Sequence, residues 1–173
     1  MIPPPELSRT FDLRSLPRGP VEIHASPDER QALARRFGVV AINSLRAVVE
    51  LEPQGAEVSA TGHLWATLVQ SCAVSGEDLA VRLEEPFTVR FTPALTAAAS
   101  EEEVELAAED LDAMEYDGTT IDVGEAVAQS LALAIDPFAV GPQAEAARKA
   151  AGLGEPNASG PFSALAALRP KPN

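Results

Sequence analysis

Residues 26–38 read SPDERQALARRFG, and this stretch carries the start and stop signals of one complete helix. Ser26 can cap the N-terminus, Pro27 suits the first helical position, and Glu29 completes a Ser-x-x-Glu capping box. Gly38 can adopt the left-handed conformation that ends a helix. The stretch therefore predicts a short helix with both boundaries defined by local chemistry.

One side of this helix is apolar and is expected to face a core. Its residues are Leu33, Ala34 and Phe37. Arg30 falls on the same side, so we expect its stem to pack there while its guanidinium reaches solvent or a carboxylate. Arg35 and Arg36 flank the apolar side.

Three long segments downstream alternate apolar and polar residues, which is the pattern of strands with one buried face. They cover residues 42–52, 57–69 and 79–92, with turns at 53–55 and 75–78. Long consecutive strands joined by short turns predict an antiparallel meander. Pro86, inside the third strand, indicates a bulge or an edge position.

Shorter elements are predicted on both sides of this meander. Residues 11–16 and 21–25 read as strands around a Pro-Arg-Gly-Pro turn, and residues 119–123 read as another short strand. Residues 143–151 predict a short helix that ends at Gly152.

A second main helix is predicted over residues 123–135. Asp122 can cap it, Glu125 stands at the capping-box position, and Asp136-Pro137 stops it. Its apolar arc is wide and predicts deep packing on the sheet. The residues of that arc are Val123, Ala126, Val127, Leu131, Leu133 and Ala134.

The chain has 173 residues, enough to form one domain with a real core. No apolar run approaches the roughly 18–20 residues that span a bilayer, and the N-terminus lacks the apolar region of a signal peptide. Its one cysteine excludes an internal disulfide and a multi-cysteine metal site. These features predict a cytoplasmic protein.

The net charge of −13 is unevenly placed, because residues 91–147 hold 13 acidic residues and no Lys or Arg. A phosphate backbone is a poor partner for that region, whereas a basic protein suits it. The candidate contact residues there are Glu101, Glu102, Glu103 and Glu105. The alternative is that the charge only keeps this surface solvated.

We expect residues 1–153 to form a single α+β domain, with residues 91–118 as an acidic, partly ordered insertion. Its antiparallel sheet is either open or barrel-like, with two or three helices. Residues 154–173 are rich in Pro, Gly, Ser and Asn and predict a flexible tail. Phe162, Leu165 and Leu168 have helical spacing there, so they either dock on a partner or fold back on the domain.

No constellation of residues indicates catalysis. Cys72 lacks a histidine placed by spacing to act as its base, so we interpret it as a buried structural residue. His63 and Trp65 share a strand face and could stack on bases, but a half-buried strand explains them more simply. Phosphate loops, nucleophile elbows and zinc-protease motifs are absent from the sequence. We therefore predict a protein without enzymatic activity, cofactor or metal.

Several segments in order resemble the YceD family, the large-subunit ribosomal RNA accumulation proteins, most closely their alphaproteobacterial branch. The segments are ELSR (6–9), DERQALARRFG (28–38), GHLWATLVQSC (62–72), PFTV (86–89), IDVGEAVAQSLALAIDPF (121–138) and PFSALAALR (161–169). Many family members continue from the matching cysteine as Cys-x-x-Cys, with further cysteines near the C-terminus that form a framework for zinc. Here Ser75 occupies the second position, so the resemblance does not carry a metal site to this chain.

The resemblance implies a non-enzymatic role in accumulation of the large-subunit ribosomal RNA. We expect the partner to be a basic ribosomal or assembly protein, and neither DNA nor a membrane. The alternative is direct binding of ribosomal RNA by Arg30, Arg35, Arg36 and Arg46. A hydrolase built on Cys72 is the third hypothesis, disfavoured by its missing base. RNA binding would weaken steeply with salt, which separates the first two hypotheses.

Overall fold

The computed structural model describes residues 5–94 and 113–153 and has an α+β fold. In chain order its elements are β1 (Thr10–Asp12), the 3-10 helix η1 (Leu13–Ser15), β2 (Val21–His24), α1 (Pro27–Phe37), β3 (Ala41–Gln54), β4 (Glu57–Ser71), β5 (Asp78–Pro93), β6 (Ala113–Tyr116), β7 (Thr120–Asp122), α2 (Val123–Ala134) and α3 (Ala144–Ala150). No helix in these two ranges is long and apolar enough to cross a membrane.

The described residues fall into two compact units. The larger contains the helices α1 and α2 and nearly all of the strand residues, within residues 5–70, 78–94 and 113–137. The smaller combines the loop 71–77 with residues 138–153, including α3. The predicted single domain over residues 1–153 stays a prediction.

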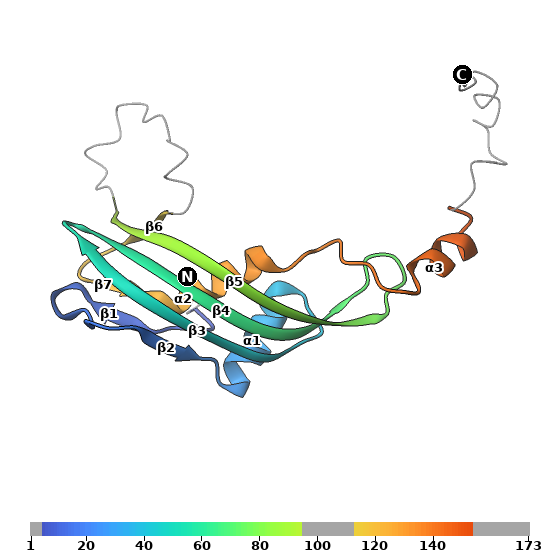
Figure 1. The fold of residues 1–173 in the computed structure, drawn as a ribbon, viewed down its shortest axis with the longest axis horizontal. Helices are drawn as coiled ribbons and strands as arrows, with labels where there is room; N and C mark the ends of the chain where they lie inside the picture. The colour runs from blue at the N-terminus through green and yellow to red at the C-terminus, as the bar shows by residue number, and fades with distance from the viewer. Residues whose placement is uncertain (1–4, 95–112, 154–173) are drawn as a thin grey trace, which may run out of the picture. The chain divides into compact units, whose positions relative to one another are not determined.

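The main sheet has the strand order β2-β3-β4-β5-β6 (Figure 1). The predicted meander is confirmed, and β3 pairs antiparallel with both β2 and β4. The strand β6 adds in parallel beside Arg90–Pro93, so the sheet is mixed and not purely antiparallel. This strand was missed because it is only four residues long and follows an acid-rich segment.

Within the described residues the sheet is open, so the barrel-like alternative is not supported. Barrel closure requires the first and last strands to pair. Here the two end strands, β2 and β6, have only four residues each, whereas the three strands between them have 14 to 16. Among the described strands, Pro86 lies on an unpaired edge of β5, as predicted, because β6 pairs with β5 only from Arg90 to Pro93.

The predicted strand over residues 11–16 ends early. β1 stops at Asp12, whose carboxylate accepts a hydrogen bond from the backbone N–H of Arg14 and so turns the chain into η1. Instead of joining the main sheet, β1 pairs antiparallel with β7, with Phe11 opposite Ile121. This two-stranded ribbon places the N-terminal segment beside the start of α2.

The helix α1 has the predicted boundaries. The Ser26 hydroxyl accepts from the backbone N–H of Glu29, and the Glu29 carboxylate accepts from the backbone N–H of Ser26, which completes the capping box. Gly38 ends the helix with φ of +68°, in the left-handed region. Leu33 and Ala34 are buried, as their spacing predicts.

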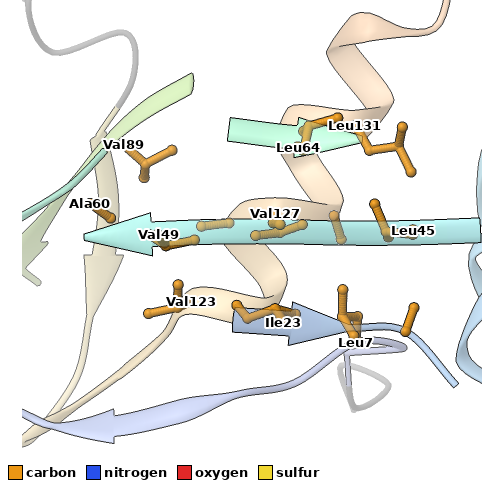
Figure 2. Packing of buried hydrophobic residues seen from close by; sticks show 14 of the residues in the cluster. Leu7, Ile23, Leu45, Val49, Ala60, Leu64, Val89, Val123, Val127 and Leu131 are labelled. Atoms are coloured by element: carbon orange, nitrogen blue, oxygen red, sulfur yellow. The ribbon is translucent and has the colours of Figure 1, made fainter. Parts of the chain in front are cut away.

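The helix α2 covers the inner face of the sheet (Figure 2). Its buried residues Val127 and Leu131 lie against strand residues of the same hydrophobic cluster. On the strands, every second residue contributes to this cluster, among them Leu45, Ala47, Val49, Leu64 and Ala66. The deep packing predicted for this helix is confirmed.

Two details of α2 were predicted wrongly. Leu133 lies at the margin of the apolar arc, four residues after Gln129, and is 84% exposed. Asp122 caps the helix by accepting from the backbone N–H groups of Gly124 and Glu125. The Glu125 carboxylate, however, does not complete a capping box, because it is held by Arg36.

The N-terminal lead-in, residues 5–9, packs directly on α2. Leu7 is fully buried, and Asp122 accepts hydrogen bonds from the Ser8 hydroxyl (2.6 Å) and the Arg9 backbone N–H (2.8 Å). This close approach needs a residue without a side chain on the helix, and Gly124 provides it. The tail (residues 154–173) and most of the acidic insertion (residues 95–112) lie outside the described residues.

Leu131→Ala should lower the free energy of unfolding by about 2–5 kcal/mol, because it removes a fully buried side chain from the core. Leu133→Ala is the matched control on the same helix, and we expect a change within about 0.5 kcal/mol. Urea unfolding of both variants measures the difference. Equal losses would show that α2 does not present Leu131 to the core.

Gly124→Ala should also destabilise the fold, although alanine is the better helix former by about 1 kcal/mol. An added Cβ would lie 2.7 Å from the Arg9 nitrogen and 2.8 Å from the Leu7 oxygen, and both are backbone atoms. We expect a loss of about 1–3 kcal/mol in urea unfolding. Gly19→Ala, with nothing within 4 Å, is the control. A stabilised Gly124→Ala variant would contradict this packing.

Candidate functional site

The four arginines proposed as an RNA-binding set do not form one free basic surface. Arg30 is half-buried and donates to the backbone carbonyl of Ala25 (2.7 Å) instead of meeting a carboxylate. Arg35 is exposed, and together with Arg30 it borders a groove of about 390 Å³ beside α1. Arg46 is on another element, the outer face of β3.

Arg36 is engaged by two carboxylates from distant parts of the chain. Its guanidinium donates to both oxygens of Glu125 on α2 (2.7 and 2.9 Å) and to Glu6 in the lead-in (2.9 Å). These bonds raise the pKa of Arg36. Burial alone would raise the pKa of Glu125, but hydrogen bonds from Arg36 and Gln129 outweigh it and lower that pKa. The network ties α1 to α2.

Beside this network the larger unit has a hollow of about 670 Å³, called the acidic hollow here. Its carboxylates are Glu6, Glu115, Asp117, Asp122 and Glu125. Arg36 is the one base among the described residues that line it, while Phe91 and Tyr116 contribute aromatic surface. Five carboxylates around one guanidinium leave the hollow negatively charged, so it suits a cationic group.

Two of these carboxylates are available to a ligand. Glu115 and Asp117 are exposed, whereas Glu6 and Glu125 are bound to Arg36 and Asp122 caps α2. The hollow was not predicted from the sequence. Its walls come from the lead-in, α1, β5 and the segment from β6 to α2, and only folding brings these together. The negative charge of residues 91–147 was the one signal that pointed toward it.

A second cluster lies on the outer face of the sheet, opposite the core. Trp65 on β4 is half-buried, and the Arg46 guanidinium lies 4.5 Å from the centre of its ring. The His63 ring stacks at 4.6 Å from Trp65, tilted by 34°, and its Nε2 is 3.5 Å from Glu84. Arg46, Trp65 and Arg82 line a hollow of about 400 Å³.

Cys72, in the smaller unit, is buried as expected, but its surroundings are polar. Its Sγ accepts hydrogen bonds from the backbone N–H groups of Ser75 (3.3 Å), Gly141 (3.3 Å) and Val74 (3.5 Å). Hydrogen bonding by Ser75, from its side chain and then its backbone, lowers the pKa of Cys72 to about 6, and the other two N–H groups act in the same direction. Only backbone donors and one hydroxyl surround the sulfur in these interactions, and they supply no general base.

The two histidines, considered as possible bases for Cys72, contact groups other than this thiol. His24 lies 3.4 Å from Glu22, and His63 contacts Trp65 and Glu84. In residues 5–94 and 113–153, no three His, Cys, Asp or Glu side chains are arranged to hold a metal ion. The remaining predicted contact residues lie outside the described ranges; they are Glu101, Glu102, Glu103, Glu105, Phe162, Leu165 and Leu168.

The low pKa of Cys72 makes its contribution to stability depend on pH. The thiol ionises near pH 6 in the folded protein and near pH 9 when unfolded, so the thiolate stabilises the fold as pH rises from 6 to 9. Below pH 6 this contribution is lost. Urea unfolding at pH 5.5 and 8.5 should therefore show a larger deficit for Cys72→Ser at the higher pH. An equal deficit at both values would contradict the folded-state pKa.

Comparison with known protein families gives a match over much of the chain. The family model described as "Large ribosomal RNA subunit accumulation protein YceD" matches residues 60–169, which is more than half of the chain. The match starts within β4 and includes α2 and the Cys72 loop, whereas α1 precedes it. No curated protein and no solved structure showed significant similarity to the chain.

Proposed function

The chain belongs to the YceD family of large ribosomal RNA subunit accumulation proteins, and from that premise we propose that it is a cytoplasmic, non-catalytic factor that binds a basic protein. A ribosomal or assembly protein is the partner whose chemistry fits. By holding such a protein, the factor would support accumulation of the large-subunit ribosomal RNA.

The observation that carries this proposal is the acidic hollow. Glu115 and Asp117 are exposed at it, and the carboxylates already bound to Arg36 leave that cation little charge to offer an anionic ligand. The aromatic surface of Tyr116 and Phe91 lies in the same walls. A lysine or arginine side chain combines a cationic head with an apolar stem, so it can use both features.

The position of the acid-rich sequence supports the same partner. Residues 101–112 contain seven acidic residues and lead directly into β6, which contributes Glu115 to the hollow. A concentration of one charge raises the association rate of an oppositely charged protein and repels one of like charge. The charge of this part of the sequence thus favours a basic protein over a phosphate backbone as the partner.

A non-catalytic role agrees with the family description, which names an accumulation factor and not an enzyme. The interactions of Cys72 supply hydrogen-bond donors to the sulfur and no base for a hydrolytic step. The geometry of this thiol therefore gives the hydrolase hypothesis no support.

The alternative is direct binding of ribosomal RNA by the arginines of α1 together with Arg46. Two features weigh against the helix as the contact. Arg36 is neutralised by Glu6 and Glu125, and Arg30 is committed to a backbone carbonyl. Arg35 is the remaining arginine of that helix, and it is exposed.

The double variant Glu115→Gln/Asp117→Asn should slow association with isolated basic large-subunit ribosomal proteins, because it removes the two exposed carboxylates of the hollow. Folding stability should change by less than about 1 kcal/mol, since exposed charges contribute little. The wild-type rate should fall with added salt, and the variant's rate should fall less. Stopped-flow or surface-binding kinetics measure both.

The matched control is Glu50→Gln/Glu52→Gln, which removes the same charge from exposed positions on β3. A second test neutralises Glu101, Glu102, Glu103 and Glu105 to Gln and should slow association further. Direct RNA binding predicts the opposite, because removing acids would tighten it. If every variant associated like the wild type with each basic protein tested, the acidic hollow would not be the binding site.

A further inference from the structure

The outer face of the sheet carries a second surface that the acidic hollow does not explain. Arg46, Trp65 and Arg82 come from the neighbouring strands β3, β4 and β5, with Arg46 directly opposite Trp65 in the register. Among the described residues, these three alone line a hollow of about 400 Å³, without a carboxylate. We propose that this surface binds single-stranded RNA.

The two surfaces lie on opposite sides of the same sheet. Residues alternate along a strand, so Trp65 points away from the face to which Leu64 and Ala66 contribute core side chains. α2 covers that inner face (Figure 2), whereas Trp65 lines a hollow on the other side together with Arg46 and Arg82. One protein could therefore hold a basic protein on one side and RNA on the other.

Charge is the first argument for RNA. Arg46 and Arg82 are both exposed, and neither forms an ion pair with another described residue. The protein as a whole carries a net charge of −13, so two unneutralised guanidinium groups at one hollow are unusual in this chain. Arginine is suited to phosphate because its planar fork donates two parallel hydrogen bonds.

The indole supplies the second argument. Arg46 lies 4.5 Å from the Trp65 ring centre, and this cation–π contact holds its guanidinium in place before any ligand binds. The His63 ring extends the aromatic surface along β4. An unpaired base can stack on such planar groups while its phosphates meet the arginines. Bases in a duplex are already stacked, so a single strand is the better ligand.

Neighbouring acidic residues limit the path that an RNA strand can take across this face. Glu84 lies on β5 two residues from Arg82 and is 3.5 Å from His63, and Glu22 is beside His24 on β2. RNA is therefore expected to cross the strands from Arg46 to Arg82 rather than run along them. Two inter-strand spacings, or about 10 Å, separate the backbones of those two strands, which a short RNA can bridge.

The test uses the intact chain and a 12-nucleotide unstructured RNA. Trp65 is the only tryptophan, so its fluorescence reports stacking at this site without a label. RNA should quench it, and poly-glutamate of equal length should not. Equal quenching and affinity for poly-glutamate would replace RNA with an acidic peptide as the ligand and so overturn the proposal.

Variants separate the roles of the residues, with affinity measured by anisotropy of labelled RNA. Arg46→Ala and Arg82→Ala should each reduce the slope of log affinity against log salt by about 0.7, the value for one phosphate of a single strand. Arg18→Ala, an exposed arginine in a turn, is the control of equal charge and should bind like the wild type. Unchanged salt slopes in both outer-face variants would overturn the proposal.

Trp65→Ala should weaken binding by about 5- to 150-fold, the range for loss of one stacked base. Trp65→Phe keeps a ring and should retain most of the affinity, which distinguishes stacking from loss of fold; urea unfolding of both checks their stability. Glu115→Gln/Asp117→Asn should bind RNA at least as tightly as the wild type. That last measurement separates the two proposals, because the outer face can fail to bind RNA while the acidic hollow still binds a protein, and the reverse.

Discussion

Burial of one face of β3 and β4 is the constraint on which the rest of the structure depends. Alternate residues along both strands are apolar, and leaving them in water would forfeit most of the stabilisation available to a small protein with few aromatic residues. α2 meets this requirement with the buried side of its own wide arc, and α1 adds Leu33 and Ala34 to the same core. Since the helices cover one face, the opposite face is left to polar and aromatic side chains.

The covering helices are held together by charge as well as by apolar contact. Arg36 joins α1 to Glu125 on α2 and to Glu6 in the lead-in, while Asp122 joins the start of α2 to Ser8 and Arg9. The same carboxylates shape the acidic hollow, so stability and recognition share residues there. Glu115 and Asp117 are exposed and are not among these bonded carboxylates, so we expect that replacing them would change the proposed partner binding without loss of the fold.

The two proposed surfaces differ in the physics that makes them selective. In the acidic hollow, several negatively charged carboxylates would attract a cationic protein. This attraction is strongest at low salt. The outer face would combine two guanidinium groups with an indole, so that only a ligand with both phosphate and planar bases uses all of it. The family description, accumulation of the large ribosomal RNA subunit, is compatible with a protein partner and with an RNA partner.

The sequence by itself determined those features that arise from local chemistry. The cap at Ser26, the left-handed Gly38 and the alternation through β3 and β4 each depend on residues a few positions apart, and all were read correctly. Only the tertiary structure decided the partners of Arg36, the exposure of Leu133, the parallel pairing of β6 and the walls of the acidic hollow. The physical reason is distance along the chain: Arg36 and Glu125 are separated by 89 positions, and no local pattern encodes which charge a folded chain will bring to it.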